Sequence, residues 1–112
     1  MPGSYQLTTP YTLTCPECGG ALFPPLRDPT LRYRCHIGHA LSWQSLMEAQ
    51  LERIEAALGT VLVGIKERAE LCHHLAQSDE VEPETLQAMV AQAEQRAAAI
   101  KGLLEADWMP VP

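Results

Sequence analysis

Hydrophobic residues recur along the chain at two different periods, and the period changes near Ser42. After this residue the apolar positions are separated by alternating steps of four and three, which places them on one side of an α-helix. This pattern predicts a first helix over about residues 43–77. Its expected apolar face, interrupted by one arginine, consists of Met47, Leu51, Ile54, Leu58, Val61, Ile65, Arg68, Cys72 and Leu75. Ser42 or Ser45 can cap the start of this helix, and Ser45 has Glu48 three residues later, as in a capping box.

A second helix is predicted over about residues 83–107. A polar connection at residues 77–82 precedes Pro83, which suits the first turn of a helix, and Pro110 ends the periodic pattern. Its expected apolar face consists of Leu86, Val90, Ala93, Ala97, Ile100 and Leu104. A short connection between two amphipathic helices predicts an antiparallel helical hairpin over residues 42–112.

The first 41 residues show a different pattern and predict a separate small head. Residues 30–35 alternate apolar and polar side chains, which is typical of a half-buried strand, and residues 21–23 can supply its partner. Pro24, Pro25 and Pro29 interrupt the chain between these segments, so a β-hairpin is expected. The predicted fold is therefore mainly α, with a small β head of the zinc-ribbon type over residues 1–41 followed by a long antiparallel two-helix hairpin.

The head contains the most informative motif of the chain. Cys15 and Cys18 are separated by two residues, and Cys35 follows with His39 four residues after it. Two thiolates at this spacing can face one ion across a tight turn, and a further cysteine and histidine complete a tetrahedron. We predict that Cys15, Cys18, Cys35 and His39 bind a structural Zn²⁺, because sulfur and nitrogen ligands favour zinc over magnesium or calcium. A head of this size buries little apolar surface, whereas structural zinc contributes an apparent free energy of about 10 to 16 kcal/mol to folding.

Other interpretations of the cysteines and histidines stay open at this level. His36 competes with His39 for the fourth ligand position, although a residue adjacent to Cys35 is poorly placed to share its ion. Cys15 and Cys18 could instead form a redox disulfide or be ordinary buried thiols. Cys72 lies on the predicted helix face, so we expect a buried thiol there, with His73 and His74 in solvent.

Composition and charge argue against several classes of function. The chain has 112 residues and a net charge of −6, and the acidity lies after residue 41. Such a field repels nucleic acid and anionic lipid over most of the surface. Arg27, Arg32 and Arg34 could bind an anion, but we expect them to be solvated edge residues. No stretch is long and apolar enough for a transmembrane helix or an N-terminal signal, so a cytoplasmic protein is expected.

The predicted helices differ in length, and this difference suggests oligomerisation. The first helix outlasts the second by about 15 Å at 1.5 Å per residue, so Met47 and Leu51 need the head, Trp108 or a second subunit as a partner. We expect a homodimer, because one flank of a lone hairpin, consisting of Leu62, Ala69, Met89 and Leu103, would stay exposed. Gly59 and Gly64 are predicted to face Gly102 and Ala97 and to permit close helix approach, or else to be tolerated helix defects.

Two sequence blocks resemble a known family. Residues 13–23 (LTCPECGGALF) and 31–42 (LRYRCHIGHALS) look like the C-terminal extension of CheB-type bacterial chemotaxis methylesterases. The similarity continues through Leu46, Gln50 and residues 55–58 and 67–71. Phe23 and Gly59 stand where the family leads us to expect tryptophans, and Leu41 where it leads us to expect tyrosine.

The resemblance implies a place in a chemotaxis-like signalling system. The family's methylesterase domain uses serine, histidine and aspartate, and nothing in this chain matches that machinery, so we expect no enzyme activity. The expected function is a non-catalytic, zinc-binding interaction or regulatory module that dimerises or docks a partner protein through its helices. The alternatives are a fragment or relative of a methylesterase, and a nucleic-acid-binding zinc ribbon, which would usually be basic.

Overall fold

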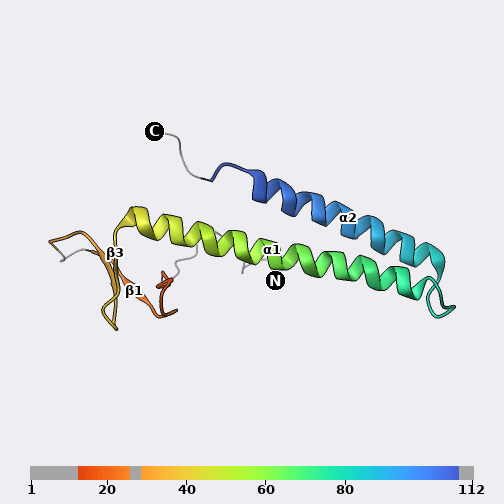
Figure 1. Ribbon diagram of the computed structural model, residues 1–112, viewed down its shortest axis with the longest axis horizontal. Helices are drawn as coiled ribbons and strands as arrows, with labels where there is room; N and C mark the ends of the chain where they lie inside the picture. Colours follow the sequence, from red (N-terminus) through yellow and green to blue (C-terminus); the bar gives the residue numbers. More distant parts are fainter. Residues whose placement is uncertain (1–12, 26–28, 109–112) are drawn as a thin grey trace. The chain divides into compact units, whose positions relative to one another are not determined.

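The computed structural model describes residues 13–25 and 29–108 of the chain. Its elements are, in order, β1 (Leu22–Phe23), β2 (Tyr33–Cys35), β3 (Ala40–Leu41), α1 (Trp43–Leu75) and α2 (Pro83–Glu105) (Figure 1). The chain divides into two compact units, Met1–Gln50 and Leu51–Pro112. The predicted mainly helical architecture with a small antiparallel sheet is confirmed.

The first unit is built on a three-stranded antiparallel sheet in the order β1-β2-β3. Leu22 pairs with Cys35 in the predicted hairpin, and Tyr33 pairs with Leu41 on the other side of β2. The strand predicted over residues 30–35 is shorter than expected and begins at Tyr33. Leu31 has a φ of 57°, a left-handed conformation that breaks an extended strand. The sheet therefore consists of very short strands that meet around the cysteines.

The start of α1 belongs to the first unit. The backbone N–H of Ser45 donates to Oγ of Ser42 at 3.2 Å, so Ser42 is the N-cap and the alternative cap at Ser45 is wrong. One turn into the helix, Leu46 is buried in a cluster with Cys15, Leu22 and Cys35. The boundary between the compact units consequently falls after Gln50 instead of after residue 41. The predicted face began at Met47, which is exposed, because the helix presents the preceding residue to the core.

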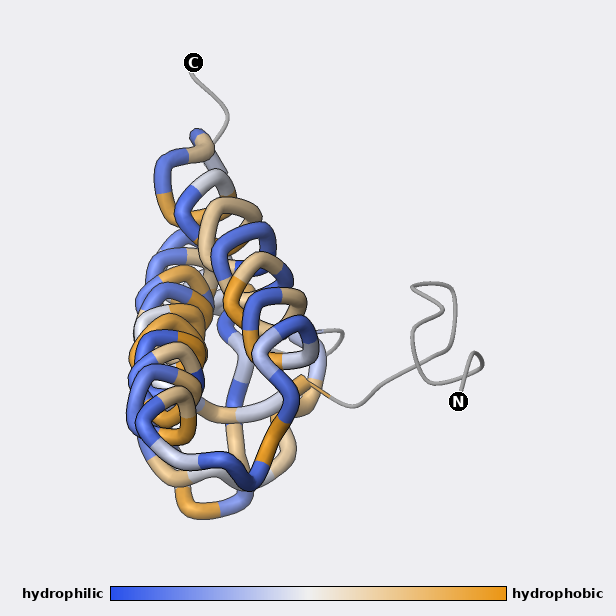
Figure 2. Tube along the Cα trace, turned by 90° about the vertical axis from the view of Figure 1, so that its right-hand side faces the viewer, coloured by the Kyte–Doolittle hydropathy of each residue, from blue (hydrophilic) through white to orange (hydrophobic). Residues whose placement is uncertain are grey.

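The second unit is a helical hairpin made of the rest of α1 and of α2, which lie side by side (Figures 1 and 2). α1 ends at Leu75 and α2 ends at Glu105, each two residues before its predicted end. Pro83 is the first residue of α2, as predicted, and Glu84 lies in the first turn near the positive end of the helix. After α2 the indole N–H of Trp108 donates to the carbonyl of Leu103 at 2.8 Å, which satisfies one of the last carbonyls of the helix. Pro110 lies outside the described residues.

The packed face of α1 in the hairpin agrees with the prediction at most positions and differs at a few. The predicted members that are buried or half-buried are Leu51, Leu58, Ile65, Cys72 and Leu75, whereas Ile54, Val61 and Arg68 are exposed. Leu62 and Ala69, which were expected on an exposed flank, are half-buried instead. The change at Arg68 has a physical reason, because the predicted face would bury its charge without a partner. Met89 of the predicted exposed flank is also half-buried, and Leu103 is exposed as expected. The face predicted for α2 is confirmed, since all six of its residues are buried or half-buried.

The helical glycines do not mediate close helix approach. A Cβ atom built at Gly59, Gly64 or Gly102 would meet nothing within 4 Å. The close helix approach predicted at Gly59 and Gly64 is therefore wrong, and both glycines of α1 are tolerated defects of the helix. Neither helix is apolar over a stretch long enough to cross a bilayer, within the residues that are described.

Candidate metal centre

Cys15 and Cys35 each begin a tight turn, and the two turns are closed in the same manner. The N–H of Cys15 donates to the carbonyl of Gly20 at 2.7 Å, and the N–H of Gly19 donates back to the carbonyl of Cys15 at 2.8 Å. In the second turn the N–H of Cys35 donates to the carbonyl of His39, and that of Gly38 donates back to Cys35, both at 3.1 Å.

The returning residue is a glycine with positive φ in both turns. Gly19 has a φ of 78° and Gly38 a φ of 113°, values that L-residues with a side chain rarely adopt. Gly38 precedes His39 and directs this ligand back toward Cys35, whereas Gly19 follows Cys18 and turns the chain back toward Cys15 after the second ligand. The glycine beside each ligand pair thus has a direct backbone explanation.

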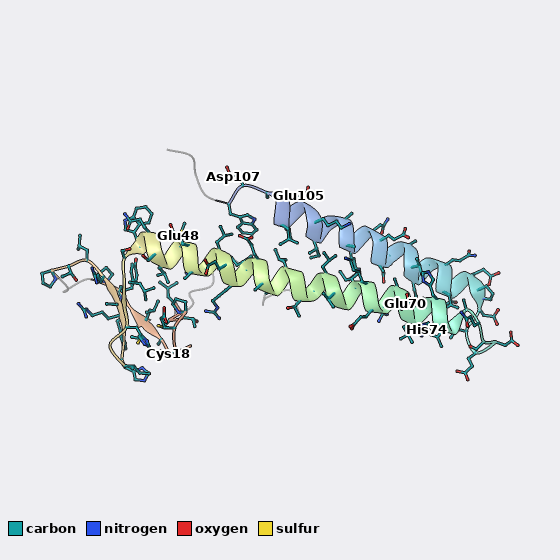
Figure 3. The ribbon with its side chains drawn as sticks, in the orientation of Figure 1. Cys18, Glu48, Glu70, His74, Glu105 and Asp107 are labelled. Atoms are coloured by element: carbon teal, nitrogen blue, oxygen red, sulfur yellow. The ribbon has the colours of Figure 1, made fainter. Side chains whose placement is uncertain are left out.

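The two turns bring Cys15, Cys18, Cys35 and His39 together (Figure 3 labels Cys18). Their donor atoms all lie within 4.8 Å of one another. The Sγ atoms of Cys18 and Cys35 are 3.7 Å apart. Nδ1 of His39 lies 3.4 Å from Sγ of Cys35 and 3.7 Å from Sγ of Cys15.

These separations match the size of a tetrahedral zinc site. Bond lengths of about 2.3 Å to sulfur and about 2.0 Å to nitrogen place tetrahedral ligands about 3.8 Å apart for two sulfurs and about 3.5 Å apart for sulfur and nitrogen. A disulfide would instead need about 2.05 Å between two sulfurs, and all four cysteines of the chain are free. The donor set therefore has the chemistry and the spacing to hold one zinc ion.

The site combines buried and accessible ligands. Cys15 and Cys35 are buried in the core cluster of the first unit, His39 is half-buried and Cys18 is exposed. Burial resists ionisation of the Cys35 thiol, but hydrogen bonds from the backbone of its turn, with a contribution from Cys18, outweigh it and lower the pKa to about 6. For Cys18 the Gly20 backbone lowers the pKa, but desolvation and the neighbouring thiols outweigh this effect and raise it.

The opposite shifts reflect different surroundings of the two thiols. Backbone donors of the second turn stabilise the Cys35 thiolate and lower its pKa, whereas desolvation and the neighbouring thiols Cys35 and Cys15 raise the pKa of Cys18. A bound divalent cation would favour all the thiolates.

His36 does not join the cluster. Its side chain is exposed and lies beside Gly20, where a Cβ atom would meet Cε1 of His36 at 3.2 Å and Sγ of Cys18 at 3.4 Å. Of the two candidate histidines, the one brought among the three sulfurs is His39. The Gly20 contact is a feature that sequence reasoning missed, since only the fold places this glycine against an imidazole.

The remaining candidates form no second cluster of this kind among the described residues. Cys72 is buried, as predicted, while His73 and His74 are exposed and both interact with the carboxylate of Glu70. Figure 3 labels Glu70 and His74 near the end of α1. Arg32 and Arg34 are exposed, and Arg27 lies outside the described residues. The described serines bond to each other or to backbone groups: Ser42 bonds to Ser45, and Ser78 donates to the carbonyl of Leu75.

Comparison with protein families, with characterised proteins and with solved structures finds no match to this chain. The resemblance to the methylesterase extension accordingly rests on the two cysteine-containing blocks and the positions after them.

Proposed function

We propose that the protein is a non-catalytic zinc-ribbon module of a chemotaxis-like signalling system, which forms a homodimer or docks a partner protein through its helical hairpin. Zinc held by Cys15, Cys18, Cys35 and His39 stabilises the first unit and so fixes the start of α1. The resemblance of residues 13–23 and 31–42 to the methylesterase extension supplies the link to signalling. A cytoplasmic location, where the thiols stay reduced, accords with this role.

The observation that carries the interaction role is the apolar surface of the hairpin. Val61 is 47%, Leu71 55% and Leu103 43% exposed, while in the described part of the second unit the buried apolar residues are only Cys72, Leu86 and Ala93. A two-helix hairpin with so small a buried core has little stability of its own. Covering these side chains in a second copy removes apolar surface from water at about 25 cal/mol per Å².

Sedimentation of the zinc-loaded chain at micromolar concentration tests the dimer. Val61→Glu is expected to shift the protein toward monomer, because residue 61 borders the half-buried apolar residues Leu58, Leu62 and Ile65 on the helix and the glutamate adds a charge beside them. Val63→Glu is the matched control, since residue 63 lies nearly opposite residue 61 on the helix and is also exposed, at 56%. A wild-type chain that sediments only as monomer would contradict the homodimer.

The absence of catalysis is tested separately. The purified chain is expected not to hydrolyse a γ-glutamyl methyl ester, since it offers no serine activated by histidine and a carboxylate within the described residues. Turnover above the buffer rate, abolished by a single serine substitution, would place the protein among the methylesterases instead.

A further inference from the structure

The loop end of the helical hairpin contains a cavity of about 610 Å³ that the metal site does not involve. Its lining includes the apolar side chains of Cys72, Leu86 and Val90, of which the first two are buried. The lining also includes three exposed carboxylates, those of Asp79, Glu82 and Glu94, which we call the rim, and the exposed imidazole of His73. The cavity therefore combines buried apolar contact with exposed negative charge.

The surrounding sequence strengthens this negative field. Residues 69–95 contain no lysine or arginine, but they contain the acidic residues Glu70, Asp79, Glu80, Glu82, Glu84 and Glu94. Figure 2 looks onto this end of the hairpin, where the connecting segment is largely hydrophilic. Glu70 interacts with His73 and His74, whereas the connection itself carries Asp79, Glu80 and Glu82 without a neighbouring cation in the sequence. Like charges gathered at one end of a protein raise the local concentration of cations and cationic ligands.

From this complementarity we infer that the cavity docks a basic amphipathic helix of a partner protein. Apolar side chains of such a helix would enter the cavity, while its lysines or arginines would meet Asp79, Glu82 and Glu94. An apolar anchor surrounded by opposite charges is the arrangement by which amphipathic helices bind grooves. This inference rests on the proposed role as an interaction module and names the chemistry of the partner.

A synthetic peptide probes the site in the full, zinc-loaded chain. The probe is a labelled helical peptide of about 18 residues with leucines on one face and lysines on the other. Its binding is followed by fluorescence anisotropy. A leucine and glutamate peptide of the same pattern tests charge, and a serine and lysine peptide of the same charge tests the apolar contact. We expect binding of the first peptide, none of the second, and at least roughly tenfold weaker binding of the third.

Two matched triple variants separate the rim from the general acidity of the protein. Asp79→Asn with Glu82→Gln and Glu94→Gln is expected to weaken binding roughly tenfold. Glu52→Gln with Glu55→Gln and Glu105→Gln removes the same charge from exposed positions that do not line the cavity, and is expected to change binding less than about twofold.

A third variant fills the cavity without changing its charge. Ala91 is an exposed lining residue, so Ala91→Trp is expected to occupy the cavity and to reduce binding while the helical content stays the same. Amide signals of Cys72, Val90 and Ala91 are expected to shift on peptide addition, and those of Ile37 and Gly38 are not.

The inference would be overturned if the leucine and lysine peptide did not bind, or if the serine and lysine peptide bound equally tightly. It would also be overturned if both triple variants weakened binding equally. Displacement of the peptide by millimolar calcium, with shifts of the same amides, would identify the cavity as a cation site instead. Sedimentation of the same samples measures the homodimer, whereas fluorescence anisotropy measures peptide binding. The two proposals can therefore fail independently of each other.

Discussion

Sγ of Cys35 and Nδ1 of His39 lie 3.4 Å apart, although the two residues are four positions apart in the chain. The turn between them is closed by Gly38, whose φ of 113° is available to glycine at no steric cost. This short distance favours His39 over His36 as the fourth ligand. Substituting each histidine in turn tests the choice.

His39→Ala is expected to reduce zinc affinity by roughly two orders of magnitude or more, because it removes one of the four donors of a closed site. His36→Ala is the matched control, since His36 is exposed and outside the donor cluster. Competition with a chromophoric chelator measures both affinities. Greater loss with the alanine at position 36 would reverse the assignment.

Leu46→Ala is expected to destabilise the zinc-loaded first unit by about 2 to 4 kcal/mol, because Leu46 is 5% exposed and belongs to the cluster around Cys15 and Cys35. Met47→Ala removes a side chain of similar size that is 39% exposed, and less than about 1 kcal/mol is expected. Chemical denaturation followed by amide signals of Tyr33 and Cys35 measures the two effects. Equal costs would mean that the helix does not present Leu46 to this core.

Glycine substitutions are expected to have opposite effects in the two units. Gly59→Ala or Gly64→Ala is expected to stabilise the second unit by up to about 1 kcal/mol, since a Cβ atom would meet nothing within 4 Å and alanine favours the helix. Gly38→Ala is expected to destabilise the first unit by about 1 kcal/mol or more because of its positive φ, even though space is open there too. Thermal unfolding compares these variants, and a destabilising Gly59→Ala would revive a close contact between helices.

Acidification is expected to release the metal and loosen the first unit. The backbone of its turn lowers the pKa of Cys35 from 9.0 to about 6, so ionisation of this thiol stabilises the fold above the unfolded value, and the contribution is lost as pH falls through about 6. Protonation of the ligands also competes with zinc. A pH titration with a zinc-sensitive dye is expected to show release below about pH 6 and retention at pH 8. Retention at pH 4 would contradict this account.

The sequence predicted the elements more accurately than the way in which they pack. Helical periodicity and Pro83 located both helices within two residues of their ends, because these signals are local. The packed face of α1 was predicted only in part. Leu58, Ile65 and Cys72 lie on it as expected, but stepping by four and three fits both Val61 and Leu62, and the cost of burying Arg68 favours the face that contains Leu62 and Ala69.

The candidate site could be predicted because its information is also local. Two short motifs contain the ligands, and Gly19 and Gly38 bend the chain around them. The role of Leu46 and the cavity at the loop end could not be predicted, because both depend on residues from different elements coming together.

Metal analysis of the chain purified under reducing conditions, combined with amide spectra before and after chelation, tests the central claim most directly. The account predicts one zinc per chain, and loss of the dispersed signals of Tyr33 and Cys35 on chelation while those of Cys72 and Ala93 persist. A chain that contains no bound transition metal, yet keeps the signals of Tyr33 and Cys35 dispersed, would contradict it.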